Sequence, residues 1–304
     1  MPEASCRVGE IEIAYETFGD PADPALLLVM GLATQMIAWH DDFCAGLAAR
    51  GFHVIRFDNR DVGRSTAMRR LPVPTLRQLV VRSRKAAAYT LSDMAGDATG
   101  LLDALEIDTA HVVGASMGGM IAQTIAIEHP ERVLSLASIM SNTGARRSGQ
   151  PQLATYRVLL GRPPQERDAF VEHVLRVYRV IGSPGFDRDE ADLRRIAATS
   201  YNRGRNPAGS GRQLAAIIAS GNRTRRLQAL DVPTVVIHGT ADRLVNPSGG
   251  RATARAIPGA RLVEIEGMGH DLPRGAWPRM IEAITGNAAR AGEPLAAATG
   301  RGRL

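Results

Sequence analysis

Lysine is almost missing from this chain of 304 residues, since Lys85 is the only one and arginine carries the rest of the positive charge. Aromatic residues make up only 4% of the chain, so leucine, isoleucine, valine and methionine are expected to line any pocket. Two cysteines, Cys6 and Cys44, cannot build a disulfide framework, and their spacing matches no metal site. We therefore expect the protein to need neither a metal nor an organic cofactor.

Long hydrophobic runs are missing as well. The longest one begins at Ala25 and continues toward Ala33, which is too short to cross a bilayer. The N-terminal segment MPEASCRVGE has neither the basic region nor the apolar core of a secretory signal. These features predict a protein of the reducing cytoplasm.

The charge of the chain is unbalanced, with a formal net charge of +6 at pH 7. Such an excess would suit nucleic acid or an acidic membrane surface as partner. The arginines, however, occur in short separate groups without interleaved aromatics or zinc-knuckle spacing. These groups are Arg69-Arg70, Arg82 to Lys85, Arg146-Arg147 and Arg223 to Arg226. The pattern favours a solvated surface, so we expect no nucleic acid and no membrane as partner.

The length allows one large α/β domain with an insertion, or two ordinary domains. Short apolar runs alternate with helical patterns over residues 1–141 and again over 229–288, which is typical of βαβ units and a mostly parallel sheet. Residues 142–228 show helical spacing without a convincing strand and predict an inserted helical cap. Residues 289–304 are rich in alanine, glycine and arginine, which predicts a flexible tail. We also expect a polar lead-in before Ile11 and one helix from Met36 to Arg50.

The strongest local motif is Gly114-Ala115-Ser116-Met117-Gly118, a G-x-S-x-G pentapeptide. It follows a predicted strand, His111 to Val113, and opens a predicted helix. A sharp strand-to-helix turn of this kind exposes the serine oxygen at the carboxyl edge of the sheet, and Gly114 and Gly118 leave room for the neighbouring backbone. Ser116 is therefore the candidate nucleophile. The alternative, a serine that only caps the helix, would not require a glycine on each side.

A serine hydroxyl needs an adjacent base, and the hydrolase pattern predicts the chain order serine, acid, histidine. Asp242 follows the predicted strand Pro233 to His238, and His270 follows the last predicted strand in Gly267-Met268-Gly269-His270. Both glycine-rich loops can reach the carboxyl edge beside Ser116. The competing residues fit less well, because they lie within elements, at the wrong edge or too close to His270. They are His40, His53, His111, His129, His173, His238, Asp231 and Asp271.

A tetrahedral intermediate needs two backbone donors to hold its negative oxygen. The amide of Met117, directly after the candidate nucleophile, is expected to be one. The loop after the strand Ala25 to Met30 is expected to supply the other, and the amide of Leu32 is the better candidate there. An ordinary turn at Gly31 is the alternative.

These motifs resemble the α/β-hydrolase superfamily over roughly residues 8 to 286. Asp58-Asn59-Arg60-Asp61-Val62-Gly63-Arg64-Ser65 is similar to the family segment D-x-R-G-x-G-x-S, with Asp61 in place of the usual glycine, and we interpret it as a structural brace. Met30-Gly31 stands where many members have His-Gly. The core and catalytic segments are most similar to a subgroup of esterases that hydrolyse a methyl ester on an anthracycline, whereas the predicted cap resembles them much less.

The resemblance implies a serine hydrolase that acts on a small to medium apolar ester through an acyl-enzyme. The expected partner is thus a small-molecule ester, and the chain is expected to be a monomer or a homodimer. A carbon–carbon bond hydrolase, a lactonase or a cofactor-free perhydrolase would show the same triad. An epoxide hydrolase or a haloalkane dehalogenase would normally have aspartate in place of Ser116. A receptor or binding protein on the same fold is the alternative from another class.

Overall fold

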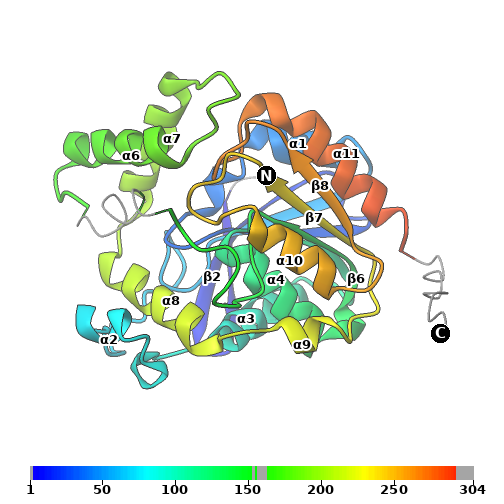
Figure 1. Ribbon diagram of the computed structural model, residues 1–304, viewed down its shortest axis with the longest axis horizontal. Helices are drawn as coiled ribbons and strands as arrows, with labels where there is room; N and C mark the ends of the chain where they lie inside the picture. Colours follow the sequence, from blue (N-terminus) through cyan, green and yellow to red (C-terminus); the bar gives the residue numbers. More distant parts are fainter. Residues whose placement is uncertain (1–2, 153–154, 156–162, 292–304) are drawn as a thin grey trace.

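The computed structural model describes residues 3–152, 155 and 163–291 (Figure 1). One eight-stranded sheet forms its centre, in the order β1-β2-β4-β3-β5-β6-β7-β8. The strands are β1 (Ala4–Val8), β2 (Ile11–Phe18), β3 (Ala25–Val29), β4 (His53–Phe57), β5 (Ala110–Ala115), β6 (Val133–Ile139), β7 (Thr234–Gly239) and β8 (Arg261–Ile265). The neighbours in the part β4-β3-β5-β6-β7-β8 all pair in parallel, whereas β1-β2 and β2-β4 pair antiparallel. The predicted α/β-hydrolase fold class is confirmed.

The helices connect these strands and cover both faces of the sheet. The α-helices are α1 (Asp41–Ala48), α2 (Leu76–Val80), α3 (Leu91–Ala104), α4 (Met117–Glu128), α6 (Arg167–Ile181), α7 (Glu190–Arg203), α8 (Pro207–Ser220), α9 (Thr224–Leu227), α10 (Ser248–Ala256) and α11 (Trp277–Ala288). Short 3-10 helices are η1 (Met36–Ala38), η2 (Arg84–Ala86), η3 (Pro130–Arg132) and η4 (Arg274–Ala276).

Side chains of the central strands alternate between two hydrophobic cores, as the period of a strand requires. In β3, Leu27 and Val29 face the core that contains α3 and α4. Leu26 and Leu28 face the other core, which contains α1 and α11. The strand is buried on both faces, which explains why its sequence is a continuous apolar run.

Two sequence expectations about elements are wrong. The residues before Ile11 are not only a lead-in, because Ala4–Val8 forms β1 and pairs with β2. The predicted helix from Met36 to Arg50 is divided into η1 and α1. The division occurs because His40 is extended and caps α1, its ring Nδ1 accepting a hydrogen bond from the amide of Asp42 at 3.1 Å.

The segment between β6 and β7 contains α6, α7, α8 and α9 and no strand among its described residues. We call residues 142–228 the helical insert. Figure 1 shows α6 and α7 projecting to one side of the sheet, while α8 lies lower, beside α2. Most of the predicted tail, residues 292–304, lies outside the described residues. Within the described ranges no helix has both the length and the apolar character that crossing a membrane requires.

Candidate active site

Ser116 lies in the turn between β5 and α4 with φ 57° and ψ −120°, a backbone conformation that is strained for a residue with a side chain. The neighbouring backbone lies so close that the motif needs a glycine at positions 114 and 118. A Cβ on Gly114 would lie 2.7 Å from the amide nitrogen of Gly119, and a Cβ on Gly118 would lie 2.8 Å from the carbonyl oxygen of Met30. The backbone of β3, β5 and α4 thus holds the turn and leaves the serine hydroxyl free to project.

The structure brings the three residues of the predicted triad together. Nε2 of His270 lies 2.9 Å from Oγ of Ser116, and Nδ1 of His270 lies 2.8 Å from Oδ2 of Asp242. His270 is on the loop after β8 and Asp242 on the loop after β7, so three loops meet at the carboxyl edge of the parallel strands. An imidazole in this position can take the proton of the serine while its other nitrogen donates to the carboxylate.

The carboxylate of Asp242 is buried and fully supported. Its Oδ1 accepts the backbone amides of Leu244 and Val245 at 2.9 and 2.8 Å. Burial opposes ionisation, but the charge of His270 and the hydrogen bonds from His238 and His270 outweigh it and hold the pKa of Asp242 well below its usual range. Asp242 is therefore ionised at neutral pH and can fix the tautomer of His270.

A second histidine reaches the same carboxylate. Nε2 of His238, a fully buried residue at the end of β7, lies 3.4 Å from Oδ2 of Asp242 and 2.8 Å from the carbonyl oxygen of Val245. The sequence reading set His238 aside because it lies in a strand. The spacing His238-x-x-x-Asp242 around a glycine was the available signal, but only the turn of the chain after β7 shows that the side chains meet.

The two predicted oxyanion donors belong to segments next to Ser116. Met117 is the first residue of α4, so its amide precedes the hydrogen-bond ladder of the helix. The amide of Leu32 has no acceptor within the described part of the chain. A Cβ on Gly31 would lie 3.1 Å from Cβ of Ser116, which shows how closely this loop approaches the serine. Both amides remain available for a developing negative charge.

The helical insert supports the loop that contains Leu32. Gln213, a fully buried residue of α8, accepts the amide of Ala33 through Oε1 at 2.8 Å and donates to the carbonyl oxygen of Arg60 at 2.9 Å. Ala33 has φ 55°, an uncommon conformation that this bond helps to maintain. Sequence reasoning missed Gln213; the available signal was a polar residue next to the apolar stripe of a helix.

The helical insert also supports the loop that contains His270. The amide of His270 donates to the carbonyl oxygen of Ile181, the last residue of α6, at 2.7 Å. The amide of Gly269 donates to Oγ of Ser183 at 2.8 Å, and that hydroxyl donates to the carboxylate of Asp271. Sequence reasoning also missed Ser183, because its partners are almost ninety positions away. Burial, the largest influence, raises the pKa of Asp271 despite this bond.

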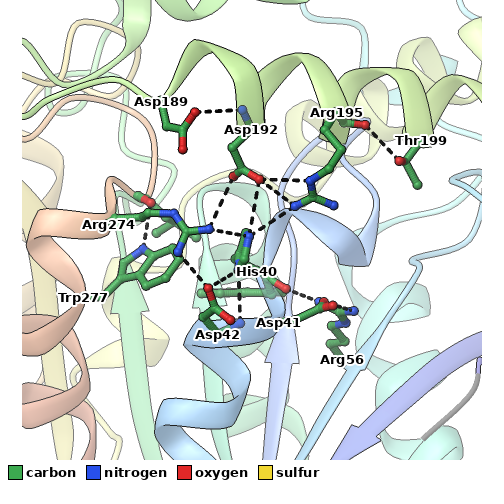
Figure 2. A network of polar contacts seen from close by, with 12 residues as sticks. His40, Asp41, Asp42, Arg56, Asp189, Asp192, Arg195, Thr199, Arg274 and Trp277 are labelled. Atoms are coloured by element: carbon green, nitrogen blue, oxygen red, sulfur yellow. Dashed lines mark hydrogen bonds and ion pairs between the residues drawn. The ribbon is translucent and has the colours of Figure 1, made fainter.

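Polar contacts join α7 to the core beside this site (Figure 2). Nε2 of His40 lies 2.8 Å from Nη2 of Arg274, 3.3 Å from Nη2 of Arg195 and 3.5 Å from a carboxylate oxygen of Asp192. Arg274 precedes α11 and also contacts Asp42 at 2.8 Å. These side chains come from α7, from the start of α1 and from η4, so the insert is attached to the sheet by more than the catalytic loops.

The segment that we interpreted as a brace contains two buried carboxylates. Asp58 accepts the amides of Met36 and Arg64 at 2.7 and 3.0 Å. Asp61, in place of the usual glycine, has φ 69° and accepts two bonds of 2.7 Å from the buried guanidinium of Arg212 in α8. Neither carboxylate makes a hydrogen bond to Ser116, His270 or Asp242. The brace thus reaches from β4 into the helical insert.

Comparison with known proteins identifies the family of this chain. A family model described as the alpha/beta hydrolase fold matches residues 24–273. Rhodomycin D methylesterase DauP from Streptomyces sp. (strain C5) is 30% identical to this chain over 93% of its length and 97% of the relative. Rhodomycin D methylesterase DnrP from Streptomyces peucetius is 29% identical over the same shares.

A solved structure shows the same similarity in three dimensions. The enol-lactonase from Burkholderia xenovorans LB400 aligns with a TM-score of 0.72 and 25% identity, over 94% of this chain and 100% of that one. The family model covers most of the chain, and the similarity to DauP extends over nearly the full length of both proteins. The chain therefore belongs to the α/β-hydrolase family.

Proposed function

We propose that this protein is a carboxylic ester hydrolase that uses Ser116 as nucleophile, His270 as base and Asp242 as the acid partner of His270. The observation that carries this proposal is the continuous chain of hydrogen-bond distances, 2.9 Å from Ser116 to His270 and 2.8 Å from His270 to Asp242. The strained turn at Ser116 supports it, because a serine with only a capping role has no need of positive φ.

The reaction proceeds in two halves. Nε2 of His270 takes the proton of Ser116 as Oγ attacks the ester carbonyl, and the amides of Met117 and Leu32 stabilise the negative oxygen. His270 then gives the proton to the departing alcohol, which leaves an acyl-enzyme. Water then attacks the acyl carbon and gives a proton to His270, and His270 passes this proton to Oγ of Ser116 as the bond to the acyl group breaks and the acid leaves. Asp242 keeps the imidazole in the tautomer that accepts at Nε2 and stabilises the imidazolium.

The substrate class that we propose is a small to medium apolar ester, with a methyl ester as the specific candidate. The support is the 30% identity to a methylesterase over almost the whole of both chains. The low aromatic content agrees with a pocket lined by aliphatic side chains. A lactone is the second candidate, because 3-oxoadipate enol-lactonase 2 from Acinetobacter baylyi is 25% identical over 84% of this chain.

Hydrolysis of a series of p-nitrophenyl esters by the wild type and by Ser116→Ala tests the reaction. We expect kcat to fall at least ~10⁴-fold in the variant, because the nucleophile, base and acid act as one unit. Its unfolding curve should match that of the wild type. Residual activity within tenfold of the wild type would contradict the role of Ser116. A fluorophosphonate that labels the wild type only would show independently that Ser116 reacts.

A second assay tests the substrate class. Methyl and ethyl esters of the same apolar acid are compared with a lactone of similar size, with release of acid as the measurement. Faster turnover of the methyl ester supports the proposal. Faster turnover of the lactone would identify the protein as a lactonase with the same three residues.

A further inference from the structure

Large apolar side chains that are exposed to solvent gather around α2. Leu76, Val80 and Val81 are 66%, 71% and 65% exposed, and Val73 is 50% exposed. No residue of α2 is buried. Leu262, at 39%, is the only other large hydrophobic side chain of the described residues that is comparably exposed, and it lies in β8. A cluster of this kind on a soluble protein marks an interaction surface.

Cationic residues flank this cluster in the sequence. Between Val62 and Ser92 the sequence contains no aspartate or glutamate. Seven cations of this stretch are exposed; Arg64 pairs with Glu3, and the other six make no ion pair with any carboxylate that the structure describes. They are Arg69, Arg70, Arg77, Arg82, Arg84 and Lys85. Their number equals the formal net charge of the chain, +6, so the rest of the protein is neutral in sum.

The position of α2 leaves this surface accessible. Figure 1 shows α2 at the lower left edge of the molecule, beside α8 and away from the sheet. The capping box of Thr75 and Gln78 holds the helix in its conformation, so it is formed before any partner binds. We call the four apolar side chains and the six cations together the α2 surface.

We propose that the α2 surface binds an anionic lipid bilayer, with Leu76, Val80 and Val81 at the boundary between headgroups and acyl chains. Exposed apolar side chains with unpaired cations close to them in the chain suit this partner, because the cations contact lipid phosphates while the apolar side chains leave water. A second copy of the chain suits it less, since a twofold contact would bring six unpaired cations against six others. The proposal departs from the sequence-based expectation of no membrane partner, which was based on arginines that looked scattered.

Sedimentation with lipid vesicles tests the proposal on the full chain. The wild type should sediment with vesicles that contain phosphatidylglycerol and not with phosphatidylcholine alone. Binding should fall at least ~10-fold between about 50 and 500 mM salt, because salt screens the attraction. The double variant Leu76→Ser/Val80→Ser and the double variant Arg77→Gln/Arg82→Gln should each lose binding at least ~10-fold.

Matched controls change the same chemistry elsewhere. Leu262→Ser removes the other exposed apolar side chain, and Arg255→Gln/Arg261→Gln removes two exposed arginines that lack ion pairs. Both controls should bind vesicles like the wild type. All variants should hydrolyse a soluble ester at the wild-type rate without vesicles, which shows that they fold.

Three results would overturn the proposal. The first is a wild type that does not sediment with anionic vesicles, and the second is a Leu76→Ser/Val80→Ser variant that binds them as well as the wild type. The third comes from light scattering. A dimer that the same variant dissociates, without any binding to lipid, would show that the α2 surface joins two copies of the chain.

Discussion

Ser116 sits on a turn that the backbone of β3, β5, β6 and α4 holds, whereas the loops with Leu32 and His270 depend on residues of the helical insert. The supports of the turn are glycines in close contact with neighbouring strands and a bond of 2.9 Å from the amide of Ser116 to Ile139. The supports of the two loops are hydrogen bonds that their backbone amides donate to Gln213, Ile181 and Ser183. Ser116 is therefore held by the core, whereas the loops with Leu32 and His270 are coupled to the insert.

A structural change in the insert would therefore act on the two loops and not on the turn at Ser116. The insert makes hydrogen bonds to the loop that contains Leu32 (the oxyanion loop) and to the loop that contains His270 (the histidine loop). A displacement of α8 or of the end of α6 would therefore change the positions of these two loops relative to Ser116. A displacement of the insert would leave the strained turn at Ser116 in place. Substitutions that weaken one kind of support and spare the other test the comparison.

The largest effect is expected from Gly118→Ala, which disturbs the backbone packing that holds the turn at Ser116. The new methyl group would overlap the carbonyl oxygen of Val29 and crowd that of Met30, and neither atom can move without β3. We expect the free energy of unfolding to fall by about 3 kcal/mol or more, together with loss of esterase activity. Urea unfolding measures the first and the p-nitrophenyl assay the second.

Gly96→Ala is the matched control for that substitution. Gly96 is an exposed residue of α3, and a Cβ there would meet nothing within 4 Å. The control should gain roughly 0.5–1 kcal/mol, because alanine favours a helix over glycine. A Gly118→Ala protein as stable as Gly96→Ala would disprove the role assigned to the backbone contacts.

The next largest effect is expected from Gln213→Met, which removes the hydrogen bond that supports the oxyanion loop. The amide of Ala33 loses its acceptor, so the neighbouring amide of Leu32 is no longer held toward the nucleophile. We expect kcat per active site to fall about 10- to 100-fold with little change in KM, because the amide acts on the transition state. Titration with a fluorophosphonate gives the number of active sites.

Gln123→Met is the control, since Gln123 is an equally buried glutamine that binds Ser138 and Arg223 instead. It should lose stability to a similar degree, about 1–3 kcal/mol, without a change in kcat per active site. Equal losses of kcat in both variants would mean that Gln213 has only a structural role.

A pH effect of intermediate size is expected in the strand that precedes the nucleophile. Burial lowers the pKa of His111 in β5 to about 4, against 6.5 for an ordinary histidine. Between these values the unfolded chain binds a proton that the folded chain does not, so stability falls as the pH drops from 6.5 to 4 and the loss is complete below 4. Allowing for partial solvation, we expect about 2 kcal/mol.

His111→Asn isolates this contribution, because asparagine can still bond to Ser135 but does not titrate. Urea unfolding at several pH values should show a smaller decrease for the variant than for the wild type. Curves that remain parallel from pH 6.5 to 4 would show that His111 does not couple the core to pH.

The smallest effect is expected from Ser183→Ala, which removes the hydroxyl that supports the histidine loop. The amide of Gly269 and the carboxylate of Asp271 each lose a partner, but the bond from His270 to Ile181 remains. We expect kcat/KM to fall roughly 3- to 10-fold, since one of two supports is left. The profile of kcat/KM against pH should shift, because the environment of His270 changes.

Ser183→Thr retains the hydroxyl and should restore both the rate and the pH profile. A shift of the profile in Ser183→Thr as large as in Ser183→Ala would contradict the hydrogen-bond explanation, because only the alanine variant lacks the hydroxyl.

Much of the site could be predicted from the sequence, because each motif is short and lies next to a helix or strand with a clear pattern. The Ser116 motif and the glycine-rich loop at Asp242 follow strands that are buried throughout, and the glycine-rich loop at His270 follows the shorter strand Arg261–Ile265. The carboxyl ends of parallel strands meet at one edge, so the order of these motifs was enough to predict that their side chains come together. The edge strand β1 was not readable, because it is short, polar and mostly exposed.

Local periodicity and the chemistry of a few motifs are enough to predict the parallel sheet and the residues that meet at its edge. The residues that support them are visible only in the folded chain. Ala33 and Gln213 are 180 residues apart, and Ser183 and Gly269 are 86 apart, so no local pattern connects them. The same holds for the α2 surface, because exposure depends on what packs against a segment and not on its own residues.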